Sequence, residues 1–131
     1  MAAVKTKKIL IMEDDLAMRE IVSRKLSSAA FEVRSAEDGS KGLELVTSFR
    51  PDLILMDLMM PGLDGFKVLE AIRGMPDKEL AKVHVIVLSN LWSSNDILRV
   101  KALSVDDYLV KAYFTPDEIL VKINEVLSKN N

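Results

Sequence analysis

The sequence contains no cysteine, a single histidine and few aromatic side chains, which make up 5% of its residues. Without cysteine, the chain can form neither disulfides nor thiolate metal sites, and it has no thiol nucleophile. Because His84 is the one histidine, a multi-histidine metal site is excluded, as is any mechanism that needs two histidines. These absences narrow the possible chemistry before any motif is considered.

The sequence also lacks a long apolar run and a strong excess of charge of one sign. The first apolar run, residues 9–12, is too short for a membrane span or a signal-peptide core, and three acids follow it. We therefore expect a cytoplasmic location. The net charge of −2 gives no indication of bulk binding to nucleic acid or to an acidic membrane.

The length of 131 residues fits one domain with a sizeable core. We predict a single domain over residues 1–131, with its core at about residues 7–127 and no second domain after Leu127. Hydrophobic residues make up 49% and charged residues 29%, which is an ordinary globular composition.

Short apolar runs alternate with longer stretches of helical spacing along the whole chain. The runs that predict strands are residues 8–12, 31–35, 53–56, 83–88 and 108–110. Met18, Ile21, Val22 and Leu26 predict the apolar stripe of a first helix. Thr115 and Pro116 predict the start of a last helix, and residues 95–104 predict a helix with a poor apolar stripe. Five such units favour an α/β fold: a doubly wound parallel sheet of five strands with helices on both faces.

Polar and charged side chains end the predicted strands. They are Glu13, Asp14 and Asp15 after the first strand, Asp57 after the third, Ser89 after the fourth and Lys111 after the fifth. Ligands in such folds lie beyond the carboxyl ends of the strands, and adjacent strands are ~4.8 Å apart. If these strands are neighbours, their carboxylates repel one another unless a cation binds, and Mg²⁺ prefers oxygen ligands of this kind.

Four segments resemble the receiver domains of response regulators in two-component systems. They are ILIMEDD at 9–15, PDLILMDLMMPGLDG at 51–65, VIVLS at 85–89 and DDYLVK at 106–111. The resemblance covers residues 7–127, and the order and spacing of all four segments together make it specific. It implies a flavodoxin-like sheet with strand order 2-1-3-4-5.

The resemblance also implies a role for each strand-end residue. Asp57 would accept a phosphoryl group from the phosphohistidine of a sensor histidine kinase or phosphotransfer protein. The chain would be no enzyme beyond self-catalysed phosphotransfer and slow autodephosphorylation. Mg²⁺ would be held by Glu13, Asp14, Asp57 and the backbone carbonyl of Met59. Ser89 would donate a hydrogen bond to the phosphoryl group, and Lys111 would neutralise its charge.

The output implied by the resemblance is a switched surface for protein binding. Tyr108 would move as Ser89 shifts toward the phosphoryl group, and a downstream protein would bind the 95–127 face; no nucleic acid or membrane contact is expected. A packed edge aromatic is the alternative for Tyr108. We expect Asp15 and Asp64 to be helix-cap or loop carboxylates and His84 to be a partly buried residue at a strand start. Pro61 and Gly65 are expected to shape the loop and start the next helix. The methionines at 12, 56, 59 and 60 are expected to be mostly packing material.

Two residues depart from the family pattern, and two apolar residues flank the expected phosphoryl site. Ala112 follows Lys111 where the family usually has proline after a cis bond, so either this bond is trans or the site holds a costly cis peptide. Asn90 stands where a small residue is usual. Met59 and Leu91 flank the expected phosphoryl site, and we hypothesise that these apolar side chains prolong the life of the acyl phosphate.

Three rival functions remain to be weighed. An aspartate-nucleophile phosphohydrolase normally has a second aspartate two residues after the first, where this chain has Met59, and it needs room for a cap domain. A nucleotide-binding module would carry GxGxxG or GxxxxGK[ST], and neither occurs. A degenerate receiver that serves only as a scaffold is disfavoured because Asp14, Asp57 and Lys111 are all present.

Overall fold

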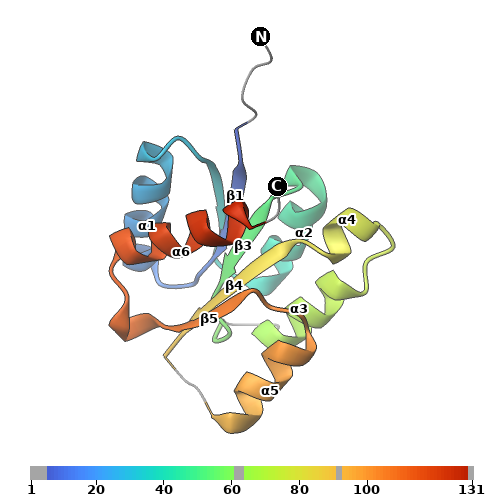
Figure 1. Ribbon diagram of the computed structural model, residues 1–131. Helices are drawn as coiled ribbons and strands as arrows, with labels where there is room; N and C mark the ends of the chain where they lie inside the picture. The colour runs from blue at the N-terminus through green and yellow to red at the C-terminus, as the bar shows by residue number, and fades with distance from the viewer. Residues whose placement is uncertain (1–5, 61–63, 91–92, 130–131) are drawn as a thin grey trace.

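The computed structural model describes residues 6–60, 64–90 and 93–129. Strands and helices alternate along this part of the chain (Figure 1): β1 (Lys8–Met12), α1 (Leu16–Ser28), β2 (Glu32–Ala36), α2 (Gly39–Phe49), β3 (Leu53–Met56), α3 (Gly65–Arg73), α4 (Lys78–Ala81), β4 (His84–Ser89), α5 (Ser94–Ala102), β5 (Asp107–Val110) and α6 (Pro116–Ser128). All five predicted strands are confirmed, with bounds that agree to within one residue. The short helix α4 was not predicted, because four residues are too few for a periodic pattern.

The strands form one parallel sheet with the order β2-β1-β3-β4-β5. Met12 pairs with Met56, Met56 with Val87, and Ser89 with Val110. The carboxyl ends of β1, β3, β4 and β5 therefore meet at one edge of the sheet, and the strand order switches between β1 and β3. This is the place where doubly wound sheets bind their ligands.

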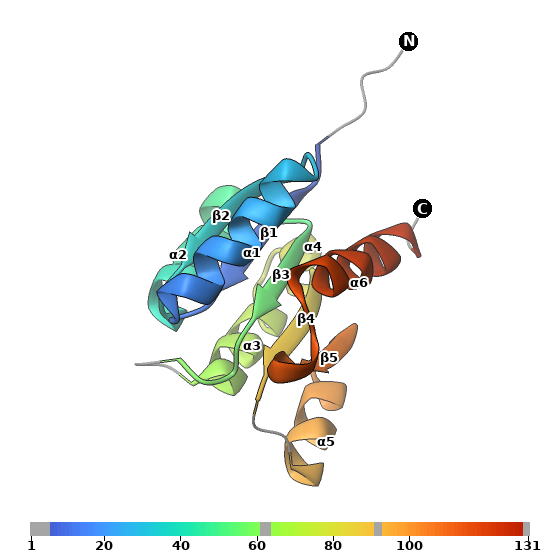
Figure 2. The same ribbon diagram turned by 90° about the vertical axis from the view of Figure 1, so that its left-hand side faces the viewer.

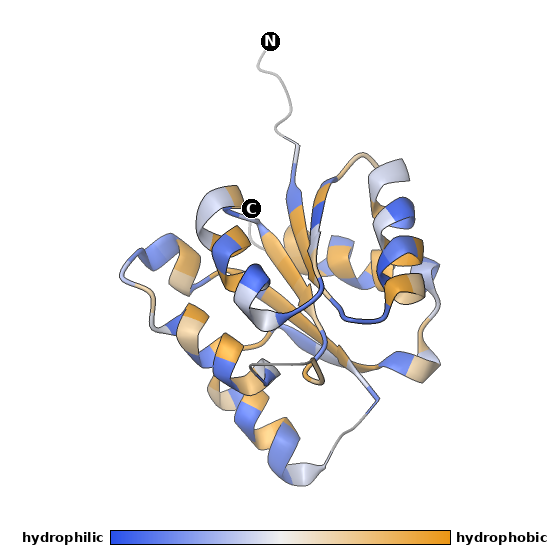
Figure 3. Ribbon diagram, turned by 180° about the vertical axis from the view of Figure 1, so that it is seen from behind, coloured by the Kyte–Doolittle hydropathy of each residue, from blue (hydrophilic) through white to orange (hydrophobic). Residues whose placement is uncertain are grey.

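Helices cover both faces of the sheet. Helices α1 and α6 lie on one face, and α2, α3, α4 and α5 lie on the other (Figures 1 and 2). Since side chains alternate along a strand, Ile9 and Ile11 of β1 join the core beneath α1 and α6, whereas Leu10 and Met12 join the other core. The inner strands are apolar on both sides, as Figure 3 shows by their hydrophobic colour between more hydrophilic helices.

Side-chain caps start the helices. Asp15, Asp38, Asp64 and Asp77 each accept a backbone N–H from the first turn of the helix that follows, and Thr115 forms a capping box with Glu118. The predictions for Asp15, Asp64 and the Thr115 start are confirmed. Capping satisfies N–H groups that otherwise have no partner within the helix.

Gly65 allows α3 to begin close to the loop after β3. A Cβ at this position would lie 2.5 Å from the Cα of Leu58, so any other residue would push the helix away from that loop. The loop and helix start expected at this glycine are confirmed. Pro61, which was expected to shape the same loop, lies outside the described residues.

Two details of the outer elements could be judged only from the fold. Ile21 belongs to the apolar stripe predicted for the first helix, yet it is 52% exposed, and Val22 and Leu26 carry the packing of α1. That part of the stripe prediction is wrong, because a stripe read from sequence spans a wider arc than the sheet covers. His84 is half-buried at the start of β4, as predicted, and its Nδ1 lies 3.2 Å from Asp106 Oδ1.

Candidate functional site

The backbone brings Glu13 and Asp57 to the same level of the sheet edge. The Asp57 N–H donates to the Met12 carbonyl (3.0 Å), and the Glu13 N–H donates to the Ala36 carbonyl (3.0 Å). Each bond continues the ladder one residue beyond its strand. The side chains that follow β1 and β3 therefore start from adjacent, well-ordered backbone.

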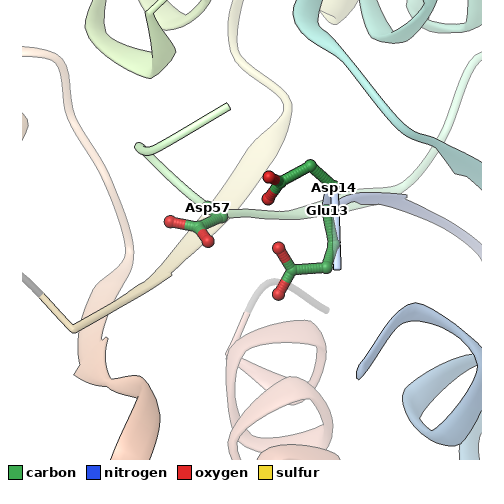
Figure 4. A group of neighbouring side chains, drawn as sticks. All are labelled: Glu13, Asp14 and Asp57. Carbon is green, nitrogen blue, oxygen red and sulfur yellow. The ribbon is translucent and has the colours of Figure 1, made fainter. Parts of the chain in front are cut away.

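Three carboxylates gather at this edge. Glu13, Asp14 and Asp57 each offer an oxygen, and these oxygens lie within 4.8 Å of one another (Figure 4). Glu13 is 4% exposed and Asp57 is 6% exposed, whereas Asp14 is exposed to solvent. The predicted meeting of the first and third strand ends is thus confirmed, and Asp15, the third acid of the run, points to its cap instead.

Lys111 enters the cluster from the end of β5. Its Nζ lies 2.7 Å from Asp57 Oδ2 and is also paired with Glu13 Oε1. Burial lowers the pKa of Lys111, but the hydrogen bonds that its ammonium donates to Asp57 and Glu13 outweigh this effect, so the pKa is raised above its ordinary value. Lys111 is therefore a charged ammonium that bridges two carboxylates.

The cluster has more negative charge than Lys111 neutralises. Burial raises the pKa of Glu13 to about 7; Lys111 opposes this rise and the negative charge of Asp57 adds to it. Glu13 Oε2 is buried and has no hydrogen-bond partner among residues 6–60, 64–90 and 93–129. A buried carboxylate oxygen without a donor, beside two further carboxylates, fits a hard divalent cation with oxygen ligands.

The second oxygen of Asp57 is held by the loop that follows β3. The Met59 N–H donates to Asp57 Oδ1 at 3.0 Å, so both carboxylate oxygens have a fixed partner. The Met59 side chain is 57% exposed, although methionines of this segment were predicted to be mainly packing material. That prediction is wrong for Met59, because its side chain faces solvent beside the site.

The remaining predicted residues lie on the two outer strands. Ser89 is fully buried at the end of β4, where the sheet pairs it with Val110. Tyr108 is half-buried on β5, and Lys101 Nζ lies 6.0 Å from the centre of its ring. Ser89 and Lys111 thus lie at the ends of the neighbouring strands β4 and β5. The acid cluster lies at the ends of β1 and β3, on the same edge of the sheet.

The bond between Lys111 and Ala112 is trans. The chain turns directly into a short 3-10 helix (Lys111–Tyr113), and the Ala112 N–H donates to Asn90 Oδ1 at 2.8 Å. Sequence reasoning noted both unusual residues but missed their contact. The available signal was that the two departures stand just beyond neighbouring strand ends. Leu91, expected to flank the site, lies outside the described residues.

A parallel sheet in the order 2-1-3-4-5 that gathers acids and a lysine at its carboxyl edge defines a flavodoxin-like α/β fold. The family model of the response regulator receiver domain matches residues 9–124. The chain therefore belongs to this family: it is a receiver domain of a two-component response regulator. This family is not a family of classical enzymes, which argues against the phosphohydrolase alternative.

Known relatives agree with this assignment. The chain is 36% identical over 124 residues to the DNA-binding dual master transcriptional regulator RpaA of Synechocystis, covering 95% of this chain and 50% of that protein. It is 34% identical to the response regulator MprA of Mycobacterium tuberculosis, covering 93% and 51%. The chain thus spans about half the length of the curated relatives it matches.

Solved structures show the same fold. The chemotaxis response regulator CheY4 of Vibrio cholerae has a TM-score of 0.83 and 29% identity, with 93% of this chain and 99% of that chain covered. A CheY-like receiver domain protein from Methanospirillum hungatei has a TM-score of 0.87 and 25% identity, with 95% and 96% covered. Within the described residues, no helix is both long and apolar enough to cross a membrane.

Proposed function

We propose that Asp57 is the phosphoacceptor of this receiver domain. A carboxylate oxygen of Asp57 attacks the phosphorus of a phosphohistidine on a sensor histidine kinase or phosphotransfer protein. A phosphorus–oxygen bond forms, the phosphorus–nitrogen bond breaks, and its electron pair returns to the imidazole nitrogen. The observation that carries this proposal is the buried Asp57 carboxylate, bonded to Lys111 at 2.7 Å within an acid cluster.

Other residues around Asp57 bind or supply positive charge at the reacting carboxylate. Glu13, Asp14, Asp57 and the backbone carbonyl of Met59 would hold Mg²⁺, which supplies positive charge for the phosphoryl oxygens. Lys111 adds an ammonium at the same edge, and Ser89 supplies a hydroxyl donor. Lys111 already pairs with Asp57, so it is placed to remain beside the group that Asp57 accepts.

The output of this switch is a surface for a downstream protein. Phosphorylation adds roughly −1.5 to −2 charges, and Tyr108 then moves with Ser89 toward the new group. The 95–127 face carries exposed apolar side chains, Leu98 on α5, Tyr113 after β5 and Val121 on α6, which suit contact with a protein. This domain, residues 1–131, makes no direct nucleic acid or membrane contact and acts in the cytoplasm.

The test is transfer of radiolabelled phosphate from acetyl phosphate in the presence of Mg²⁺. The parent chain takes up label, Asp57→Asn takes up none, and label is lost when the metal is chelated. Asp64→Asn is the matched control, because Asp64 is an exposed cap carboxylate at the start of α3 and should label like the parent. Equal labelling of Asp57→Asn and the parent would refute the proposal, and an unlabelled parent would favour the scaffold alternative.

The lifetime of the acyl phosphate depends on the side chains beside it. Met59 is exposed next to Asp57 and offers no polar group that could orient an attacking water. A phosphate-release time course on Met59→Asn with Leu91→Glu is expected to run several-fold faster than on the parent. Unchanged release would show that these positions do not protect the acyl phosphate.

A further inference from the structure

A side-chain hydrogen bond joins the two loops that leave β4 and β5. Asn90 follows Ser89, Ala112 follows Lys111, and Asn90 Oδ1 accepts the Ala112 N–H at 2.8 Å. The regular ladder between these strands ends at the pair Ser89 and Val110. The Asn90 amide therefore supplies an acceptor where the backbone ladder has ended, and it holds the two loops together one step further.

This bond exists because residue 112 is not proline. Proline has no backbone N–H, so the family's usual residue after the lysine could not donate here. The bond would also be lost if the Ala112 N–H pointed toward solvent. A small side chain at position 90 could not reach that N–H. The two unusual residues therefore work as a pair across the sheet edge.

The bond acts on the backbone unit next to Lys111. The peptide group that carries the Ala112 N–H also contains the Lys111 carbonyl, and a peptide group is planar. Holding that plane against Asn90 fixes the Cα–C bond of Lys111 and so restricts the position from which its side chain starts. The Lys111 Nζ then reaches Asp57 Oδ2 at 2.7 Å and the carboxylate of Glu13.

We propose that Asn90 is a positioning residue, which sets the Lys111 ammonium beside Asp57 through the Ala112 N–H. Because Asn90 is also bonded to Ser89 along the chain, it ties the hydroxyl and the ammonium of the site to one another. It touches neither the phosphoryl donor nor the cation. This inference rests on the proposed phosphoacceptor function of Asp57.

The first test compares Asn90→Ala with Asn90→Asp, which keeps an acceptor oxygen of the same reach. The rate of phosphorylation is measured against acetyl phosphate concentration at saturating Mg²⁺. The maximal rate of Asn90→Ala is expected to fall about fivefold, the factor that one ordinary hydrogen bond contributes. Asn90→Asp is expected to restore the rate to within about twofold of the parent. Mg²⁺ affinity measured by calorimetry should stay unchanged in Asn90→Ala, which adds no charge beside the acid cluster.

The second test separates positioning of Lys111 from a general loosening of the loop. In a Lys111→Met background, Asn90→Ala should cause no further loss, because the residue that it positions is gone. In an Ala112→Pro background, Asn90→Ala should likewise cause no further loss of rate, because proline has no N–H to donate. When Asn90→Ala is made in the otherwise unchanged protein, the NMR signal of the Ala112 amide proton should shift upfield. Circular dichroism checks that every variant is folded.

Each failure has a distinct meaning. A labelled parent with an equally fast Asn90→Ala overturns the inference and leaves the function of Asp57 intact. The same fold loss with and without Lys111 also overturns it, since Asn90 would then act by another route. A parent that takes up no label overturns the proposed function, and the role of Asn90 with it.

Discussion

The two edges of the sheet carry similar residues but treat their charges in opposite ways. At the amino edge, Asp52 Oδ2 accepts the Lys8 N–H (2.8 Å) and Asp106 Oδ2 accepts the Val85 N–H (2.8 Å). At the carboxyl edge, Glu13 and Asp57 are buried around one ammonium, and Glu13 Oε2 has no hydrogen-bond partner among the described residues. The amino edge uses carboxylates to complete the backbone, whereas the carboxyl edge keeps excess negative charge.

Arg73 makes the contrast clearer. It lies at the end of α3 on the amino side, and its guanidinium donates to four carbonyls that precede β4 and β5, those of Ala81, Val83, Leu103 and Ser104. Among the described residues, no buried side-chain polar atom at this edge lacks a hydrogen-bond partner, whereas Glu13 Oε2 at the carboxyl edge does. The amino edge thus satisfies its polar groups within the fold, and the carboxyl edge keeps negative charge that fits a cation.

The largest expected effect comes from removing the clamp at the amino edge. Arg73→Met leaves four carbonyl groups without their donor and should lower the free energy of unfolding by about 3 kcal/mol. Urea denaturation measures this loss. Arg24→Met, an exposed arginine on α1, is the control and should change stability by less than about 0.5 kcal/mol. Equal losses in the two variants would show that the clamp does not stabilise this edge.

The next effect tests the excess charge at the carboxyl edge through pH. The pKa of Glu13 is raised from 4.5 to about 7, so the folded state binds more protons than the unfolded state between these values. The free energy of unfolding contributed by this group therefore falls as pH rises from about 4.5 through 7, by on the order of 1–3 kcal/mol. Urea denaturation of the metal-free protein at a series of pH values measures the slope.

Glu13→Gln is the matched control for this pH dependence. Glutamine keeps the shape of the side chain but cannot ionise, so the fall in stability between pH 4.5 and 7 should become shallower. A slope identical to that of the parent would show that Glu13 is not the group responsible.

A smaller gain is expected when a divalent cation is added. At pH 7.5, Mg²⁺ at ten times its Kd should raise the free energy of unfolding of the parent by about 1.4 kcal/mol. Asp14→Asn should reduce this gain at the same Mg²⁺ concentration, because one of the three carboxylates is lost. Asp38→Asn, a helix-cap carboxylate of α2 outside the acid cluster, should respond like the parent. Equal gains in all three proteins would place the cation elsewhere.

The smallest effect is expected for a single contact at the amino edge. Asp52→Ala removes the acceptor of the Lys8 N–H and should cost about 1 kcal/mol of stability. Labelling with acetyl phosphate should not change, because Asp52 lies at the edge opposite Asp57. If Asp52→Ala kept the stability of the parent but labelled more slowly, the amino edge would contribute to phosphorylation and not to stability, which would contradict the difference proposed between the two edges.

Much of the fold could be predicted because its signals are local. The run of residues 53–56 is apolar throughout and forms β3 with the predicted bounds, and Thr115, Pro116 and Glu118 start α6 through contacts within one turn. The order of the strands came from the family resemblance, since no local pattern says which strands pair. Ile21 was misplaced for the same reason: its spacing is helical, but only the packed sheet decides which side of the helix is covered.

The sequence by itself determined which chemical groups end the strands: acids after β1 and β3, a hydroxyl on the last residue of β4 and a lysine after β5. Only the tertiary structure decided how they combine. Lys111 meets Asp57 across 54 positions of the chain, and Asn90 meets Ala112 across 22. It also buries Glu13 while leaving its neighbour Asp14 exposed. The physical reason is that residue type is local, whereas burial, pairing and the resulting pKa depend on which distant strands become neighbours.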